Sequence, residues 1–172
     1  MALFMRRLQN KILLCMAGFV MSLLFAECVT DKDEPGSGLG VGDAIPYFSI
    51  VMNDGSTLTS YDLLGREAVI CFFNTECPDC QRELPMLQTE YDKSLATPGS
   101  NMIYVCISRE EDAESVDKYW REHSLTLPWS AQTDRSIYNL FADTGIPRVY
   151  RISPDGRIIF VEKGRQTYPL NH

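Results

Sequence analysis

A continuous apolar run followed closely by a cysteine pair constrains this fold more than any other feature. Residues 68–73 read Ala-Val-Ile-Cys-Phe-Phe, which is the length of one strand and offers no polar face. Such a run is typical of a strand buried on both faces, so other layers must cover its sheet on both sides. Cys77-Pro78-Asp79-Cys80 then opens a stretch with apolar residues at helical spacing, namely Leu84, Leu87, Tyr91 and Leu95.

The hydrophobic pattern predicts the other elements as well. Strands at 47–52 and 56–59 flank an Asn-Asp-Gly turn and predict a hairpin, after which Ser60 can cap a short helical turn. Further along we expect a buried strand at 102–107, a helix at 112–123 packing through Val116, Tyr119 and Trp120, a short helix at 135–141 capped by Asp134, and strands at 148–152 and 157–161. The predicted class is α/β, with a central mixed β-sheet flanked by helices and an N-terminal β-hairpin extension.

Composition excludes several classes of protein. The chain has 172 residues, 45% of them hydrophobic, with a formal net charge of −7. These values indicate one acidic globular domain and exclude a multi-span membrane protein and a disordered chain. They also argue against a nucleic-acid partner, since such a protein carries a basic patch. Six cysteines are too few, at this length, for a disulfide-stapled miniprotein.

The N-terminus has the pattern of an export signal. Basic Arg6, Arg7 and Lys11 precede an apolar run over 12–25, which is shorter than the roughly 20 residues that span a bilayer. A buried core helix is the alternative, but the run lacks polar positions at helical spacing. We therefore place a signal sequence at 1–27, with Cys15 inside it.

The residues after the signal predict a tether. The stretch 24–28 resembles a bacterial lipobox, which makes Cys28 the candidate lipid anchor, although Glu27 stands where a small residue is usual. Cleavage after Ala26 and an uncleaved anchor are the alternatives. We expect a flexible acidic tether at 28–40 and the folded domain at 41–172, in the bacterial cell envelope and facing the periplasm. An acidic surface does not adhere to anionic lipid, so membrane attachment would come from the lipid or the signal alone.

The cysteine pair is the candidate reactive site. Backbone amides at a helix N-terminus favour a thiolate, and two cysteines one turn apart can close a disulfide. Pro78 suits the first helical position, where no amide donor is needed. We expect Cys77 to attack a substrate disulfide and Cys80 to resolve the mixed disulfide, with no cofactor.

Three other uses of the pair are open. A structural zinc site needs four ligands, yet the chain has one CxxC and only His123 and His172, so no metal is expected. A purely structural disulfide is compatible with export. A peroxidatic cysteine would have Cys77 attack peroxide.

Residues 65–85 resemble the core of the thioredoxin-like oxidoreductases, in particular the exported TlpA/ResA type. The matching features are Gly65 before the apolar strand, the CxxC pair and Pro85. Residues 144–150 resemble the cis-proline loop of that family, and 153–156 its hairpin turn. The resemblance covers about residues 41–163 and implies a thioredoxin-like thiol–disulfide oxidoreductase. It also implies a cis Pro147 facing the CxxC, substrate backbone pairing at Ile146, a proton-accepting Glu83 beside Cys80, and a kink at Pro85.

The departures from that family concern charge and packing. Glu76 replaces the usual tryptophan, and together with Asp79 it opposes formation of a thiolate. Cys71 occupies the position at which cytosolic thioredoxins have a buried aspartate, which leaves Glu83 as the nearby candidate for a proton acceptor. Cys71 and Cys106 lie in apolar strands and are expected to behave as small buried hydrophobes. At 164–172 no final helix is evident, so either the domain lacks it or a partner covers that face.

We therefore expect an envelope-tethered enzyme that reduces disulfides through Cys77 and Cys80. Its partners would be cysteine-containing exported proteins and an upstream membrane electron donor. One alternative is a non-enzymatic lipoprotein with a structural Cys77–Cys80 bridge. The other is a peroxiredoxin-type peroxidase, for which the expected upstream proline and threonine are missing.

Overall fold

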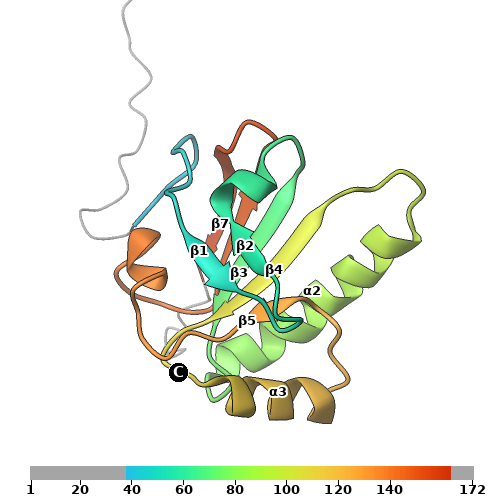
Figure 1. Cartoon of the computed structure of the whole chain (residues 1–172), viewed down its shortest axis with the longest axis vertical. Helices are drawn as coiled ribbons and strands as arrows, with labels where there is room; N and C mark the ends of the chain where they lie inside the picture. The colour runs from blue at the N-terminus through green and yellow to red at the C-terminus, as the bar shows by residue number, and fades with distance from the viewer. Residues whose placement is uncertain (1–37, 164–172) are drawn as a thin grey trace, which may run out of the picture. The chain divides into compact units, whose positions relative to one another are not determined.

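The computed structural model describes residues 38–163 and contains a mixed sheet with strand order β5-β4-β3-β6-β7 (Figure 1). On one side of β3, strands β4 and β5 run parallel to it; on the other side, β6 pairs antiparallel with β3 and β7 pairs antiparallel with β6. The bounds are β3 Ala68–Phe73, β4 Ile103–Ser108, β5 Trp129–Ser130, β6 Arg148–Ile152 and β7 Ile158–Lys163. The predicted fold class is confirmed. The predicted signal at 1–27, the anchor Cys28, most of the tether and residues 164–172 lie outside the described residues.

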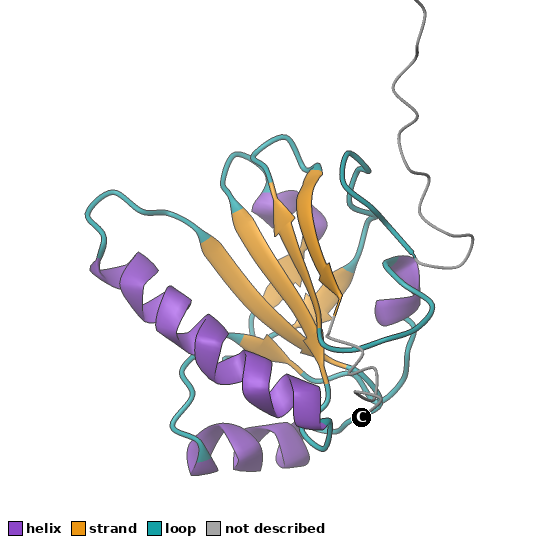
Figure 2. Cartoon of the chain, turned by 180° about the vertical axis from the view of Figure 1, so that it is seen from behind, coloured by secondary structure: helices purple, strands orange, loops and turns teal. Residues whose placement is uncertain are grey.

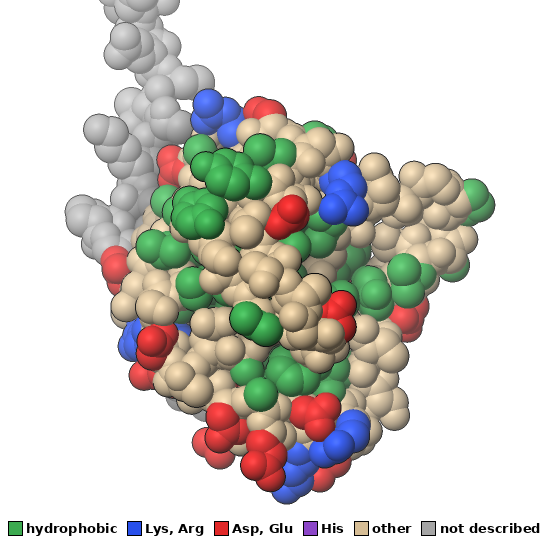
Figure 3. Space-filling model, viewed as in Figure 1, with side chains coloured by type: hydrophobic (Ala, Val, Ile, Leu, Met, Phe, Trp, Pro, Cys, Tyr) green, Lys and Arg blue, Asp and Glu red, His purple; other side chains and the backbone are tan. Residues whose placement is uncertain are grey.

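Helices cover one face of the sheet and a hairpin covers the other. Helices α2 (Pro78–Ala96) and α3 (Ala113–Glu122) pack on the face seen in Figure 2. The opposite face carries β1 (Ser49–Val51), β2 (Thr57–Thr59) and the 3-10 turns η1 (Ser60–Leu63) and η2 (Tyr138–Leu140). Hydrophobic side chains gather on the surface near η1 (Figure 3), where the rings of Tyr47 and Tyr61 lie 5.4 Å apart. Within residues 38–163, no helix has both the length and the apolar character needed to cross a membrane.

Strand β3 supplies both layers of the core. Val69, Cys71 and Phe73 face the cluster formed with α2 and α3, whereas the alternate residues face the cluster on the hairpin side. Each side chain of β3 is at most 2% exposed, because successive side chains of a strand point to opposite faces. The prediction of a strand buried on both faces is confirmed.

The first 3-10 turn is capped one residue earlier than predicted. The carboxylate of Asp62 accepts hydrogen bonds from the backbone N–H of Thr59 at 2.7 Å and from its hydroxyl at 2.6 Å. Thr59 is therefore the cap, and Ser60 is the first residue inside the turn. The prediction of Ser60 as the cap was wrong, because the acidic partner stands three residues after Thr59.

The segment before β6 is less helical than predicted. Only η2 forms within 135–141, and Asp134 accepts from the backbone N–H of Ser136 at 2.8 Å in a local turn without capping a helix. Strand β5 was missed because two residues are too short to show a periodic pattern. It pairs with Cys106 and Ile107 of β4.

Helix α2 packs through a shorter face than its periodicity predicted. Leu84 and Leu87 are buried and Tyr91 is partly buried, but Leu95 is 67% exposed. Leu95 lies on the same side of the helix as Leu84, so rotation does not explain its exposure. A 19-residue helix is about 28 Å long, whereas the six-residue β3 spans about 20 Å. The last turn of α2 therefore extends past the strand that would cover it.

Two matched substitutions test this packing. Leu84→Ala should lower the free energy of unfolding by about 2–5 kcal/mol, because it opens a cavity in the core. Leu95→Ala should change it by less than about 0.5 kcal/mol. Urea unfolding of the reduced proteins measures both values, and equal losses would contradict the assigned packing.

Candidate active site

The cysteine pair lies where β3 ends and α2 begins. Cys77 is the N-cap residue of α2, and Pro78 fills the first helical position. The Cys77 side chain is partly exposed, whereas Cys80, one turn inward, is fully buried. Both are free thiols in the structure. One sulfur is therefore accessible from outside and the other only from within.

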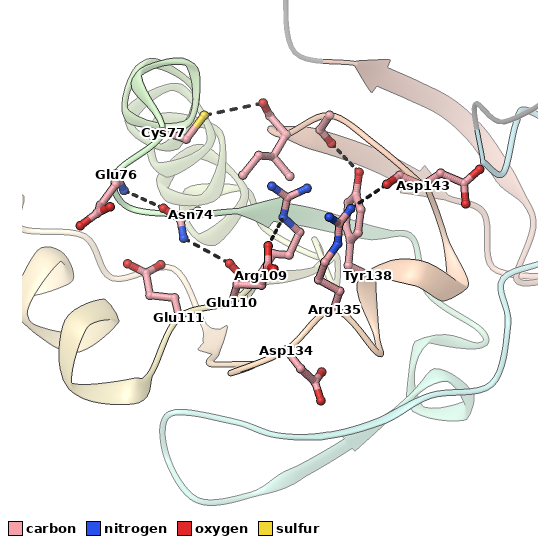
Figure 4. A network of polar contacts seen from close by, with 12 residues as sticks. Asn74, Glu76, Cys77, Arg109, Glu110, Glu111, Asp134, Arg135, Tyr138 and Asp143 are labelled. Atoms are coloured by element: carbon pink, nitrogen blue, oxygen red, sulfur yellow. Dashed lines mark hydrogen bonds and ion pairs between the residues drawn. The ribbon is translucent and has the colours of Figure 1, made fainter.

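The loop before β6 faces this pair. The thiol of Cys77 donates a hydrogen bond to the backbone carbonyl of Ile146 at 3.7 Å (Figure 4). The following Ile146–Pro147 peptide bond is cis, as the family resemblance implies. Residues 69 positions apart in the chain thus meet at one end of the sheet. The role of Ile146 and Pro147 in substrate binding remains a prediction.

The loop before β6 is held in place by side chains that were not predicted from the sequence to belong to the site. Three of its backbone carbonyls accept a hydrogen bond of 2.7 Å, namely Asp143 from Arg135, Thr144 from Arg148 and Gly145 from Tyr138. The guanidinium groups of Arg109 and Arg135 also lie over the Tyr138 ring, at 5.0 and 5.4 Å from its centroid. Figure 4 shows the side chains of Arg109, Arg135 and Tyr138 close together, with dashed lines from Arg135 and Tyr138 to the loop. The brace leaves the Ile146 carbonyl facing the reactive thiol.

A buried carboxylate fixes the segment that leads into the pair. Glu111, 9% exposed, accepts a hydrogen bond from the backbone N–H of Thr75 at 3.0 Å and a second one from the Thr75 hydroxyl. Asn74 accepts from the backbone N–H of Glu76 at 2.9 Å. The sequence carried no signal for Glu111, because its contact with Thr75 spans 36 positions.

Burial controls the ionisation of the inner thiol. Loss of hydration raises the pKa of Cys80 well above its ordinary value, and the neighbouring Cys77 thiol acts in the same direction. A hydrogen bond with the backbone of Asn74 opposes this effect. In the reduced protein Cys80 is therefore a neutral thiol.

Glu83 lies on α2 one turn after Cys80 and is half-buried. Burial, followed by the nearby carboxylates of Glu162 and Glu90, raises the pKa of Glu83, and Arg151 opposes them. Arg151 pairs with Glu90 at 2.8 Å. A carboxylate with a raised pKa is better suited to accept a proton near neutral pH. Its role as proton acceptor for Cys80 remains a prediction.

The predicted acidic surroundings of the pair are partly neutralised. Glu76 is exposed, as expected, but the carboxylate of Asp79 forms an ion pair with Arg82. Cys71 and Cys106 are each 1% exposed, as predicted for buried side chains. Across the described part of the chain, no group of three or more His, Cys, Asp or Glu side chains is placed to hold a metal ion.

The fold and the dithiol at the start of a helix define a thioredoxin-like thiol–disulfide oxidoreductase. The chain belongs to the AhpC/TSA family, whose sequence profile matches residues 41–161. It is 24% identical over 131 residues to the thiol-disulfide oxidoreductase ResA of Bacillus subtilis, covering 76% of this chain and 72% of that one. The predicted likeness to oxidoreductases of the ResA type is thereby confirmed.

Solved structures agree with this class. A thiol:disulfide interchange protein of the thioredoxin family from Chlorobium tepidum aligns with a TM-score of 0.60 and 27% identity, covering 74% of this chain and 90% of that one. The thioredoxin domain of a thiol-disulfide oxidoreductase from Bacteroides vulgatus aligns with a TM-score of 0.64 and 20% identity, covering 74% and 91%. At 20% identity, the similarity to the Bacteroides vulgatus domain shows only that the two proteins share a fold.

The raised pKa of Glu83 predicts a pH effect on stability. The folded protein binds this proton more tightly than the unfolded chain, so the contribution stabilises the fold below the ordinary pKa of 4.5. It is lost as the pH rises through the raised pKa. In Glu83→Gln this loss is absent, so the variant should gain stability relative to the wild type as the pH rises from about 4 to 7. Urea unfolding across that range measures the difference, and parallel curves would contradict the assignment.

Proposed function

We propose that this chain is an envelope-tethered enzyme that reduces disulfides of exported proteins by thiol–disulfide exchange. The observation that carries the proposal is the asymmetry of the dithiol, with a partly exposed Cys77 at the helix start and a buried Cys80 one turn inward. An accessible attacking thiol and a shielded resolving thiol are what a two-step exchange requires.

The proposed reaction proceeds through a mixed disulfide. The Cys77 thiolate attacks one sulfur of the substrate disulfide, and the other substrate sulfur leaves as a thiolate. Cys80 then loses its proton and attacks the Cys77 sulfur, which releases the second substrate thiol and leaves a Cys77–Cys80 disulfide. Two electrons pass to the substrate. We assign the proton from Cys80 to the carboxylate of Glu83.

Substrate binding is assigned to the loop beside Cys77. In the free protein the Cys77 thiol donates to the carbonyl of Ile146, so a bound substrate chain would take over this acceptor as the thiol reacts. Pro147 has no backbone N–H, which leaves that stretch of the loop without a competing donor. Support comes from the contact between the loop and Cys77 and from the bracing of the loop by Arg135, Arg148 and Tyr138.

The direction of the reaction is assigned as reducing. A strongly oxidising dithiol is one whose reduced form is stabilised. Here burial raises the pKa of Cys80, so Cys80 is a neutral thiol in the reduced form. The reduced form therefore gains no stability from a thiolate at Cys80. The electrons would come from a membrane donor. We assign export to the signal at 1–27 and attachment to Cys28, on the basis of the sequence alone.

Trapping a mixed disulfide tests the exchange. Cys80→Ser should react with insulin, used as a model disulfide, and accumulate an adduct through Cys77, because no resolving thiol is present. Mass spectrometry under non-reducing conditions detects the adduct. Cys77→Ser is the matched control and should form none. Loss of thermal stability without an adduct would instead support a structural bridge.

The reduction potential tests the direction. Equilibration with glutathione buffers should give a value near that of thioredoxin, about −270 mV, and far from that of the oxidant DsbA, about −120 mV. Quantifying the thiols of Cys77 and Cys80 by alkylation gives the ratio of reduced to oxidised protein. A potential near that of DsbA, about −120 mV, would mean that the enzyme oxidises its substrates.

A further inference from the structure

A second pair of thiols lies behind the first. Cys71 of β3 and Cys106 of β4 are register partners on neighbouring parallel strands, and each is 1% exposed. Their side chains belong to the same buried cluster as Cys80. Among the described residues, these three cysteines and Cys77 are all free thiols. The buried pair has no part in the exchange proposed above.

The spacing of the two strands permits a bond between these sulfurs. Neighbouring strands lie about 4.8 Å apart. The Cα atoms of disulfide-bonded cysteines are usually separated by about 4.4–6.8 Å. Because Cys71 and Cys106 are in register and point to the same face, the separation of their Cα atoms falls within this range.

The electrostatics show that the buried thiols act on one another. A hydrogen bond with Cys106, followed by burial, raises the pKa of Cys71, and the Cys80 thiol and the Glu83 carboxyl add to this effect. A neutral, inaccessible thiol is inert toward reagents in solvent. Exchange with the neighbouring Cys80 is then the route by which this pair can be oxidised.

We propose that Cys71 and Cys106 form a second redox-active dithiol, which is oxidised internally by the Cys77–Cys80 disulfide. This inference rests on the proposed function, since substrate turnover supplies that disulfide. A fully reduced chain would then carry the electrons to reduce two substrate disulfides before it needs its donor. The buried pair would serve as a store that returns the outer pair to its reduced form.

The transfer balances in two exchange steps. The Cys71 sulfur attacks the Cys80 sulfur of the outer disulfide, and Cys77 leaves and takes the proton that Cys71 gave up. The Cys106 sulfur then attacks the Cys71 sulfur, and Cys80 leaves and takes the proton of Cys106. The Cys77–Cys80 disulfide is reduced by two electrons, and a Cys71–Cys106 disulfide forms.

Tryptic mapping distinguishes the two disulfides in the wild-type chain. Cleavage after Arg66 and Arg82 places Cys71, Cys77 and Cys80 on one peptide, 67–82, whereas Cys106 lies on another, 94–109. The full chain is reduced, treated with excess oxidised glutathione, quenched with acid, denatured, alkylated with N-ethylmaleimide and digested. A Cys71–Cys106 bond joins the two peptides, and a Cys77–Cys80 bond does not.

The expected product contains peptides 67–82 and 94–109 joined through Cys71 and Cys106. Two variants serve as controls. Cys77→Ala cannot form the Cys77–Cys80 disulfide that would oxidise the buried pair, so it should yield no joined peptide. Cys106→Ala keeps the outer pair and should consume two thiols fewer than the wild type.

Three results would overturn the inference. In the first, Cys77 and Cys80 are bonded while Cys106 is free or carries glutathione; this leaves the proposed function intact. In the second, the joined peptide forms in Cys77→Ala, which means that the buried pair is oxidised without the outer one. In the third, no joined peptide forms and Cys77 and Cys80 both stay free in the wild type, which refutes the proposed function as well.

Discussion

The arrangement of the whole domain follows from the burial of β3 on both faces. A strand with apolar side chains in every position can lie only at the centre of a sheet that is covered on both sides. The hairpin and η2 cover one side, and α2 and α3 cover the other. The reactive pair follows directly at the end of this strand, so its position is set by the most constrained element of the fold.

The same constraint makes the two outer thiols unequal. The start of α2 lies at the end of the sheet where β3 stops, and Cys77 remains partly exposed there, while one turn further the helix packs against β3 and buries Cys80. Burial in turn raises the pKa of Cys80. A difference of one helical turn thus separates an accessible thiol from a neutral, shielded one, and the order of attack and resolution in the proposed exchange depends on it.

Local patterns predicted most of the fold, and long-range contacts account for what was missed. The bounds of β3 and β6 match their predicted ranges, because β3 is a contiguous apolar run and β6 lies just before the Pro154-Asp155-Gly156 turn. The exposure of Leu95 depends on where β3 stops relative to α2, which no periodicity within the helix records. Likewise, Glu111 holds Thr75 and Arg148 holds the Thr144 carbonyl through contacts that appear only when the sheet is assembled. The cysteine pair was predictable because its two members are neighbours in the sequence.

The buried cysteines show why register matters as much as sequence pattern. Read separately, Cys71 and Cys106 are small side chains in apolar strands, and that prediction of burial is confirmed. The pairing of β3 with β4 in register places them side by side, on the face that α2 covers with Cys80. Depth increases from Cys77 at the helix start to Cys80 and then to the strand pair. A thiol reached only through another thiol is protected from external oxidants yet remains open to exchange, and this is the property that a stored pair of electrons requires.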